Sequence, residues 1–404
     1  MSGMVIVGGG QAGYTIANKL RLMGYQGDIK IVCAENSLPY QRPPLSKKFL
    51  LGEIPKDRLF FRTENFYKEN EIGLKLGIKV NSIDRTTNRV CCSDGTEISY
   101  KKLFLTTGAV PKYFPETLGG TLSKIFYIRS LNDIKSLNME FKAGKRILII
   151  GGGYIGLEIA AVARKKNLDV TLIEAEDRIL KRVSCSQTAN FFKNLHKKNG
   201  VKIIEGETIK CLIGKNGIFS AALLSSGKKI PADFSVIGIG AKPCINLANA
   251  SGLEVDNGIR VDSFCQTSDR NILAAGDCTN FPNGLSRLRL ESVGNAIEQA
   301  ECAAMTALGH KEEYQAKPWF WSDQYDAKLQ IAGLSSGYER VLARRNEKSL
   351  SMWYFNDKNL IAVDAINDAK AFMVAKKLIA LRRTPKEESI LDLKLDLKSL
   401  LKSN

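Results

Sequence analysis

Two short glycine patterns are the parts of this sequence best suited to chemistry. They read "GGGQAG" at residues 8–13 and "GGGYIG" at residues 151–156. In a Gly-x-Gly-x-x-Gly pattern the first glycine permits a tight strand-to-helix turn, the second lets the backbone approach a pyrophosphate, and the third lets helix and strand pack closely. The phosphates then lie at the positive end of the helix dipole. The two patterns predict two dinucleotide sites in one chain.

An acidic residue follows each pattern near the distance at which a ribose is expected. Glu174 follows the strand-like run "DVTLI" and lies 18 residues after Gly156 (174 − 156). A carboxylate there accepts hydrogen bonds from ribose hydroxyls and repels a 2′-phosphate, so we predict a preference for NADH over NADPH. Arg178 keeps some use of NADPH open, and an exposed strand-end glutamate is the alternative. After the first pattern, Ala34 and then Glu35 occupy the equivalent position.

A third landmark is Gly276-Asp277, at the end of the strand-like run "RNILAAGDC". It can meet a second part of the nucleotide bound at the first glycine pattern. Two nucleotide sites in one chain indicate an enzyme that holds a flavin and a nicotinamide, in which the flavin accepts a hydride and the protein positions the two rings. We therefore expect FAD and NAD as cofactors.

The elements that must position these motifs alternate short strands with helices. The apolar runs "MVIV" and "ILII" precede the two glycine patterns, and helical spacing of apolar residues follows each. This alternation indicates parallel sheets covered on both faces. After Gln315 the runs "WFWSDQ", "KLQIAGL", "SMWYF" and "LIAVDAI", followed by the helical "AKAFMVAKKLIAL", predict a separate antiparallel sheet with a helix. The tail from Thr384 is expected to form a last helix packed on the body.

The predicted fold class is α/β, with two doubly wound Rossmann-like nucleotide-binding domains and a small α+β C-terminal domain. A chain of 404 residues exceeds what one core usually serves. We place a discontinuous FAD-binding domain at 1–108 and 241–315, a NAD-binding domain at 109–240 and the C-terminal domain at 316–404.

The composition limits the class of protein. Its 59 basic and 42 acidic residues give a net charge of +17, which fits an acidic partner or, equally, lysine-rich solvated faces. Nucleic-acid binding gains little support from charge alone. No apolar run reaches the length of a membrane span and no secretory signal is evident, so we expect a cytoplasmic protein. The nine scattered cysteines and two histidines favour neither a zinc site nor a disulfide framework.

The redox centre is not expected to be a protein residue. Disulfide reductases of related fold need a cysteine pair soon after the first nucleotide motif and a histidine–acid pair near the C-terminus. Residues 36–50 contain no cysteine, and no histidine follows His310. Single-cysteine peroxidases and oxidases are disfavoured for the same reason, because "QRPP" stands in that region.

Over nearly its whole length the sequence resembles the FAD-dependent NADH:ferredoxin reductases of bacterial oxygenase systems. The segments that carry the resemblance, in order and spacing, are "PYQRPPLSK" (39–47), "TTGAVPK" (106–112), "GGGYIGLE" (151–158), "AAGDC" (274–278), "RLESVGNAIEQA" (289–300), "PWFWSDQYDAKLQIAGL" (318–334) and "LIAVDAIN" (360–367).

The resemblance implies two sets of cofactor-binding residues. Those that would hold FAD are Gly8, Gly10, Ala12, Gly13, Lys47, Val80, Arg129, Gly276, Asp277 and Val293. Those that would hold NADH are Gly151, Gly153, Ile155, Gly156 and Glu174. Members of the family often have an acidic residue where Ala34 stands, so Glu35 or the backbone is expected to contact the FAD ribose instead.

Lys47 and Glu158 are the catalytic pair that the resemblance implies, because such residues meet beside the flavin and nicotinamide rings. A buried lysine near the flavin could stabilise negative charge on the reduced ring, and Glu158 would balance that lysine. The alternatives are a surface lysine after a turn and an ordinary glutamate in the first turns of a helix.

Trp319 and Trp321 stand two positions apart and should share one face of a strand, with Phe320 on the other face. By resemblance this aromatic wall stands near the flavin, with Trp321 the contacting residue. Two tryptophans that only fill the core of a small sheet are the alternative.

The predicted activity is transfer of a hydride from NADH to FAD, followed by release of single electrons to a small, acidic two-iron ferredoxin that feeds an oxygenase. The same chemistry with rubredoxin or oxygen as the acceptor stays open. A second alternative is a flavin-bearing interaction protein similar to apoptosis-inducing factor, in which NADH acts as a conformational ligand.

Overall fold

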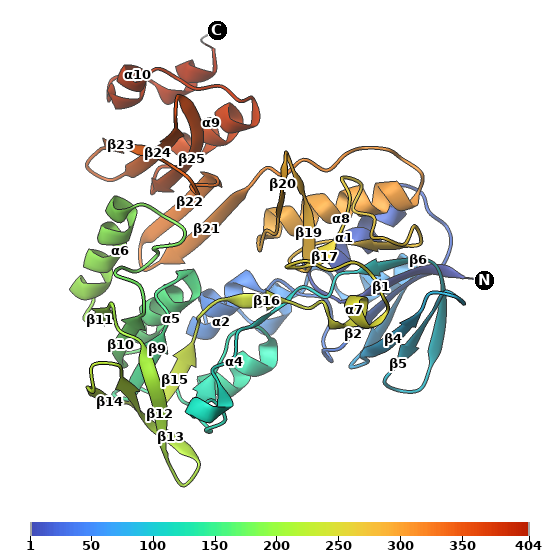
Figure 1. The fold of residues 1–404 in the computed structure, drawn as a ribbon, viewed down its shortest axis with the longest axis horizontal. Helices are drawn as coiled ribbons and strands as arrows, with labels where there is room; N and C mark the ends of the chain where they lie inside the picture. Colours follow the sequence, from blue (N-terminus) through green and yellow to red (C-terminus); the bar gives the residue numbers. More distant parts are fainter. Residues whose placement is uncertain (1, 403–404) are drawn as a thin grey trace. The chain divides into compact units, whose positions relative to one another are not determined.

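A computed structural model of the chain describes residues 2–402 (Figure 1). The described residues form two compact units. Unit 1 takes the residues up to Arg42, Pro55–Val110 and Ala241–Pro318, and unit 2 takes Pro43–Ile54, Pro111–Gly240 and the residues from Trp319 onward. The division into three domains with boundaries at 108, 240 and 315 stays a prediction. Among residues 2–402, no helix combines the length and the hydropathy needed to cross a bilayer.

Unit 1 is built on a seven-stranded sheet of order β3-β2-β1-β6-β5-β4, with β18 added beside β6. Its strands are β1 (Gly3–Val7), β2 (Ile29–Cys33), β3 (Ile72–Leu76), β4 (Val80–Asp84), β5 (Arg89–Cys92), β6 (Glu97–Leu105) and β18 (Ile272–Ala274). The pairs β3–β2, β2–β1, β1–β6 and β6–β18 are parallel, whereas β6–β5 and β5–β4 are antiparallel. Every residue of β1 is buried, as its unbroken apolar run predicts for a strand covered on both faces.

Helices and two small sheets complete unit 1. Their bounds are α1 (Gln11–Leu22), η2 (Lys56–Leu59), α3 (Glu64–Glu69), α7 (Asn246–Ala250), α8 (Val293–Ala307), β7 (Ala109–Pro111), β16 (Ala241–Pro243), β17 (Ile259–Arg260), β19 (Thr279–Asn283) and β20 (Ser286–Leu288). The last residue of β7, Pro111, belongs to unit 2. Helices α1 and α8 pack against each other (Figure 1). The apolar face of α1, with Ile16, Ala17 and Leu20, has no exposed surface and joins the core of the sheet.

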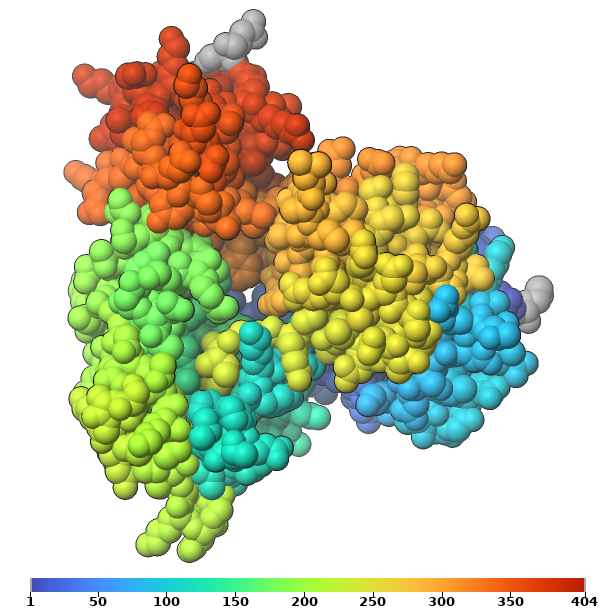
Figure 2. Space-filling view, viewed as in Figure 1, coloured from blue at the N-terminus to red at the C-terminus, as the bar shows by residue number. Residues whose placement is uncertain are grey.

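Unit 2 contains a five-stranded parallel sheet of order β11-β10-β9-β15-β8. Its elements are η1 (Pro43–Ser46), α2 (Lys48–Leu51), η3 (Glu116–Leu118), β8 (Ile125–Phe126), α4 (Leu131–Asn138), β9 (Arg146–Ile150), α5 (Tyr154–Lys165), β10 (Asp169–Glu174), α6 (Ser186–Lys198), β11 (Lys202–Glu205) and β15 (Phe234–Ile237). A three-stranded antiparallel sheet adds β12 (Ile209–Lys215), β13 (Ile218–Leu224) and β14 (Lys229–Pro231). The turn between β12 and β13 projects from the surface in Figure 2.

The C-terminal part of unit 2 is the predicted antiparallel sheet, of order β21-β22-β25-β24-β23. Its elements are β21 (Trp319–Gln324), β22 (Ala327–Gly333), β23 (Arg340–Arg345), β24 (Leu350–Asn356), β25 (Asn359–Ile366), α9 (Ala369–Ala380), α10 (Glu387–Leu391) and η4 (Leu397–Leu401). Helix α9 packs on β22 and β25. Together with the parallel sheets, this confirms the predicted fold class.

The prediction of one last helix after Thr384 is wrong. The tail forms two short helical segments, α10 and η4, joined by extended backbone at Asp392. The buried guanidinium of Arg344 explains the break, because Nη1 donates to the carbonyls of Ile390 and Asp392 at 2.6 Å and Nη2 donates to Leu395 O at 3.2 Å. A continuous helix would use such carbonyls internally. The tail does pack on the body, since Ile390 and Leu397 are buried.

Candidate functional site

The glycine loop of unit 1 meets three different physical demands. Gly8 has φ +116°, and a Cβ added to it would lie 2.3 Å from Thr106 O. A Cβ on Gly13 would lie 2.0 Å from Gly8 O. A Cβ on Gly10, in contrast, would have no atom of the described residues within 4 Å. Gly8 and Gly13 are therefore required by the fold itself, whereas the glycine at position 10 leaves a space open.

This open space lies at the start of α1, where Gly10 is the N-cap residue. Within residues 2–402, no side chain caps the helix, and its first turn carries no acidic residue. Unpaired N–H groups and the helix dipole therefore favour an anion at this position. These residues fit the pyrophosphate of a dinucleotide, as the sequence pattern predicts.

The remaining predicted FAD residues of unit 1 gather around the carboxyl edge of its sheet. Val7 and Ala274 are both register partners of Leu105, so the loops that follow them start side by side. A Cβ added to Gly276 would lie 3.3 Å from the Cβ of Ala12 and 3.7 Å from that of Ala296. The segment Gly276-Asp277 therefore lies beside α1 and the first turns of α8, the helix that begins at Val293.

Ala34 and Glu35 follow the end of β2. Ala34 is exposed, and the carboxylate of Glu35 accepts hydrogen bonds from Tyr40 Oη and Arg42 Nη2, both at 2.6 Å. Both oxygens of Glu35 thus have partners within unit 1. A contact from Glu35 to an FAD ribose stays a prediction.

Val80 is buried at the start of β4. It lies near the end of β2, because Ile78 N donates to Cys33 O at 2.9 Å. Arg129, in unit 2, precedes α4, and its backbone N–H donates to Asp133 Oδ2 at 3.0 Å. The roles of Val80 and Arg129 toward FAD stay predictions.

The second glycine loop, in unit 2, repeats the geometry of the first. Gly151 has φ +108°, with an added Cβ 2.4 Å from Gly238 O, and a Cβ on Gly156 would lie 2.1 Å from Gly151 O. A Cβ on Gly153 would meet no atom of the described part of the chain within 4 Å. Gly153 is the N-cap of α5 and Ile155 is 46% exposed. This loop also fits the pyrophosphate of a dinucleotide.

Glu174 ends β10 and contacts this second loop. Its Oε2 accepts a hydrogen bond from Gly152 N at 2.6 Å, and its Oε1 accepts one from Glu176 N at 2.9 Å. Arg178 does not pair with this carboxylate, because its guanidinium donates to backbone carbonyls, including Ser184 O at 2.7 Å. The carboxylate thus lies beside the second glycine loop, and its contact with a ribose stays a prediction.

Lys47 and Glu158 meet inside unit 2 as a buried ion pair. Lys47 Nζ lies 2.8 Å from Glu158 Oε2, with side-chain exposures of 14% and 2%. Ser46 Oγ donates to the same oxygen at 2.5 Å, and Ser322 Oγ donates to Glu158 Oε1 at 2.6 Å. The alternative that Lys47 is a surface lysine does not agree with this geometry. The carboxylate is compensated by one cation and two hydroxyl donors, as burial of a charge requires.

The tryptophan pair has the predicted arrangement on β21. The rings of Trp319 and Trp321 stack at 5.5 Å between centroids and 22° between planes. Phe320 points to the other face, where its ring lies 4.7 Å from that of Tyr154 in α5. Lys376 Nζ lies 4.7 Å from the Trp319 ring centre. Both tryptophans are half-buried, so they are not fully enclosed core residues, and a flavin contact of Trp321 stays a prediction.

The sequence analysis missed residues that only the fold brings together. Ser46 and Ser322 hold Glu158, and Thr106 holds the first glycine loop, since its Oγ1 donates to Gly8 O at 2.9 Å. A signal for Ser322 was available. In "WFWSDQ" the face opposite the tryptophans carries Phe320, Ser322 and Gln324, and two polar residues on a buried face need buried partners.

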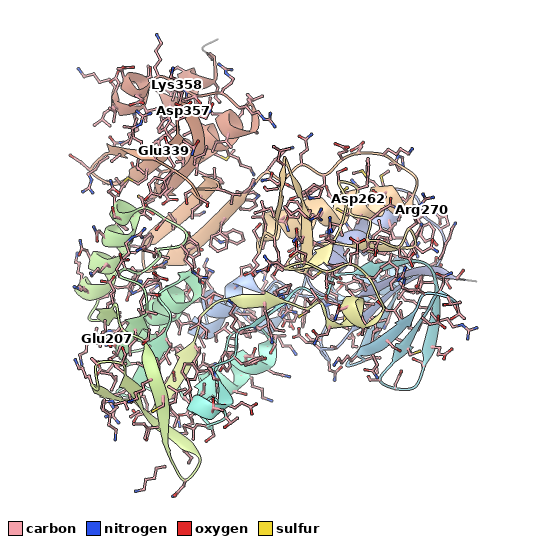
Figure 3. All side chains as sticks on the ribbon, viewed as in Figure 1. Glu207, Asp262, Arg270, Glu339, Asp357 and Lys358 are labelled. Carbon is pink, nitrogen blue, oxygen red and sulfur yellow. The ribbon has the colours of Figure 1, made fainter. Side chains whose placement is uncertain are left out.

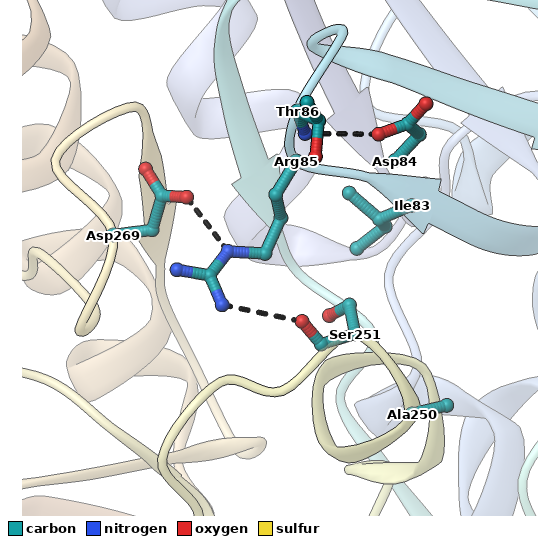
Figure 4. A pocket seen from close by; sticks show the side chains of 7 residues that line it. All are labelled: Ile83, Asp84, Arg85, Thr86, Ala250, Ser251 and Asp269. Carbon is teal, nitrogen blue, oxygen red and sulfur yellow. Dashed lines mark hydrogen bonds and ion pairs between the residues drawn. The ribbon is translucent and has the colours of Figure 1, made fainter.

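A separate depression in unit 1 carries no predicted site residue (Figure 4). Arg85 lies across it, with Nε 2.8 Å from Asp269 Oδ2 and Nη1 3.3 Å from Ser251 O. Asp84 there accepts hydrogen bonds from the backbone N–H of Thr86 at 2.9 Å. Its polar groups bind one another, so this depression offers no catalytic arrangement.

Comparison with known proteins agrees with this geometry. The family model described as pyridine nucleotide-disulphide oxidoreductase matches residues 2–304, and the model described as reductase C-terminal matches residues 319–401. Rhodocoxin reductase of Rhodococcus erythropolis is 39% identical over 399 residues, which cover 98% of this chain and 93% of that relative. Putidaredoxin reductase CamA of Pseudomonas putida is 38% identical over 397 residues, covering 96% and 94%.

A solved structure extends the similarity to three dimensions. The crystal structure of the covalent putidaredoxin reductase–putidaredoxin complex matches with a TM-score of 0.95 and 36% identity, covering 99% of this chain and 98% of the other. Because the family model matches residues 2–304 and the structure has the two open glycine loops, the chain belongs to the pyridine nucleotide-disulphide oxidoreductase family.

Proposed function

We propose that this protein is an NADH-dependent flavoprotein reductase that transfers electrons through FAD to a small iron–sulfur ferredoxin serving an oxygenase. The carrying observation is the pair of helix N-termini, one in each unit, that Gly10 and Gly153 leave open. It occurs in a chain that is similar over nearly its full length to rhodocoxin reductase and putidaredoxin reductase. Although the family name refers to disulfides, residues 36–50 contain no cysteine.

The residues that would hold FAD are those gathered at the carboxyl edge of the unit 1 sheet. Gly10 admits the pyrophosphate to the start of α1, and Gly276-Asp277 lies beside it. Bound FAD supplies the conversion of a hydride into two single electrons. Lys47 contributes a positive charge compensated by Glu158, and such a charge stabilises negative charge developing nearby. Trp321 would cover the flavin ring.

The residues that would hold NADH surround the second loop. Gly153 would admit the pyrophosphate to the start of α5, and Glu174, whose carboxylate contacts the same loop, would face the ribose. The carboxylate would repel a 2′-phosphate, which is the basis of the proposed preference for NADH. Residues 109–240 would form the NAD-binding domain, residues 1–108 and 241–315 the FAD-binding domain, and residues 316–404 the C-terminal domain.

An acidic ferredoxin fits the net charge of +17. Exposed acidic side chains are interspersed with the basic ones, as Asp262 and Arg270 in unit 1 and Glu339, Asp357 and Lys358 in unit 2 illustrate (Figure 3). Long-range attraction by the net charge can raise encounter rates about 10- to 1,000-fold at low salt. A cytoplasmic location, where NADH is available, is part of this proposal.

The decisive experiment is anaerobic reduction of the FAD-loaded protein by NADH, followed by addition of an acidic two-iron ferredoxin. Absorbance at the flavin and iron–sulfur bands is followed together. Rapid bleaching of the flavin by NADH and its recovery as the ferredoxin is reduced are expected. A chain that cannot take up FAD would end the proposal.

The same experiment separates the alternatives. Transfer to rubredoxin or oxygen, with none to ferredoxin, would assign another acceptor. Slow reduction with a lasting charge-transfer band, together with retarded migration of nucleic acid at physiological salt, would favour an interaction protein similar to apoptosis-inducing factor.

A further inference from the structure

The hydrogen bonds around Glu158 continue beyond its first partners. Ser322 Oγ, which donates to Glu158 Oε1, accepts a hydrogen bond from Gln324 Nε2 at 3.2 Å. Gln324 Oε1 lies 2.9 Å from Nε2 of His196 on α6. Tyr325 Oη lies 3.4 Å from His196 Nδ1, and the two rings meet edge to face at 5.1 Å. We call these four residues, Ser322, Gln324, His196 and Tyr325, the Glu158 relay.

The chemistry of each member fixes the direction of the relay. The amide nitrogen of Gln324 can only donate, so its oxygen must accept, and His196 must carry its proton on Nε2. Nδ1 of His196 is then an acceptor, which suits the hydroxyl of Tyr325. Burial lowers the pKa of His196 to about 4, so the ring is neutral at neutral pH. Every donor in the relay therefore points toward Glu158.

Most of the relay is buried, and burial strengthens its hydrogen bonds. Ser322, Gln324 and His196 have no exposed surface. In a low-dielectric interior, hydrogen bonds in series polarise one another and an unpaired polar group is costly. The relay therefore holds Glu158 Oε1 on Ser322, and this fixes the orientation in which Oε2 receives Lys47 and Ser46.

We propose that Gln324 and His196 are positioning residues for hydride transfer: through Ser322 they orient the Glu158 carboxylate and hold Lys47 in place for the flavin. This inference rests on the proposed function, because it assigns a task to the same ion pair. Among residues 2–402, neither residue makes a hydrogen bond or an ion pair with Lys47 or Glu158. An amide cannot pass on a proton readily, so the relay positions the carboxylate and does not conduct protons.

Activity of the FAD-loaded protein gives the first test. Gln324→Leu and His196→Leu are expected to lower the rate of flavin reduction at saturating NADH by up to about 10-fold, the upper end of the loss expected for one hydrogen bond between neutral groups. The Kd for NADH should change less than about 2-fold. His196→Gln keeps an N–H donor for Gln324 and is expected to restore most of the rate. This separation of rate from binding distinguishes positioning from general damage.

A matched control exists in the same part of unit 2. Tyr354 Oη donates to the fully buried carboxylate of Asp364, and among residues 2–402 no hydrogen bond joins that pair to the relay. Tyr354→Phe removes a hydroxyl donor from a buried carboxylate and is expected to lower stability without changing the reduction rate. If Gln324→Leu behaves like Tyr354→Phe, or if His196→Gln is as slow as His196→Leu, the positioning role is wrong.

A second readout needs neither FAD nor turnover. The chain has two histidines, so ¹⁵N spectra of the histidine rings give two sets of signals, and His310→Gln identifies those of His196. The signals should report the Nε2–H tautomer and should shift in Glu158→Gln, which weakens the acceptor at the end of the relay, but not in Tyr354→Phe. An Nδ1–H tautomer, or signals unmoved by Glu158→Gln, would overturn the inference. If NADH fails to reduce FAD bound to the wild-type protein, the proposed function is wrong. The histidine spectra would still show whether the relay exists.

Discussion

The protonation of His196 can be predicted from its surroundings. The ring has no exposed surface and contacts Gln324 and Tyr325, neither of which is anionic at neutral pH. Burial lowers the pKa of His196 from 6.5 to about 4. The unfolded chain therefore binds a proton between these pH values that the folded protein excludes. Stability from this residue is complete above about pH 6.5 and is lost as the pH falls toward 4.

The size of the effect follows from the shift. Each pKa unit corresponds to about 1.4 kcal/mol, so a decrease of about 2.5 units costs about 3 kcal/mol of unfolding free energy between pH 7 and pH 4. The comparison that isolates His196 is the difference in unfolding free energy between wild type and His196→Gln, because all other groups titrate in both proteins. Between pH 7 and pH 4, wild type should lose about 3 kcal/mol of unfolding free energy relative to His196→Gln.

Two measurements check the reasoning. Urea unfolding of both proteins at several pH values gives the difference directly, and ring proton spectra give the titration midpoint of His196, with His310→Gln to identify its signals. A midpoint near 6.5, or a difference in unfolding free energy that is the same at pH 7 and pH 4, would show that burial does not exclude the proton.

Further predictions concern the core, the glycine loops, the ribose contact and the partner. Burial raises the pKa of Asp364 from 3.8 to about 6, so wild type loses stability as the pH rises. Asp364→Asn should therefore gain about 2 kcal/mol of unfolding free energy relative to wild type between pH 4 and pH 8, as urea unfolding can measure. Gly10→Val has room for its Cβ, so this variant should keep the fold and lose FAD uptake. The Cβ of Gly13→Val would lie 2.0 Å from Gly8 O, so that variant should unfold the loop. Circular dichroism measures the fold and flavin titration measures FAD uptake. Glu174→Ala should lower the ratio of kcat/KM for NADH to that for NADPH about 10-fold, and an unchanged ratio would remove Glu174 from the ribose site. Raising ionic strength should slow turnover with an acidic ferredoxin but not with an uncharged quinone acceptor; equal salt responses would exclude steering by charge.

Local patterns predicted the geometry of the two glycine loops, each a tight turn from a strand into a helix. The spacing of Gly8 and Gly13 reflects backbone contacts that lie within one strand-to-helix turn, so a short stretch of sequence contains all the information. The same applies to the alternation in β21, where residues two apart share a face. The stacked Trp319–Trp321 pair confirms that alternation.

Contacts between distant segments were harder to predict. Lys47 and Glu158 were paired through the family resemblance, because no local rule joins residues so far apart in the chain. His196 gave no signal at all, since a single histidine on a helix resembles any buried polar residue until Gln324 lies opposite it. The break in the C-terminal tail was missed because it depends on the buried guanidinium of Arg344, a tertiary contact.

The hairpin that carries β21 has a consequence for how the chain tolerates length changes. Gln324 and Ala327 are register partners, and Tyr325 at the turn between them has φ +56°. The pairing of β21 is thus anchored from its far end by a tight turn, where a slip of one residue would exchange the two faces. Residues inserted before Trp319 should therefore lengthen the preceding connection without changing the strand register. A single residue inserted at the turn should shift the register of β21 and turn Ser322 and Gln324 outward. The junction preceding β21 is the better place to splice this module onto another reductase.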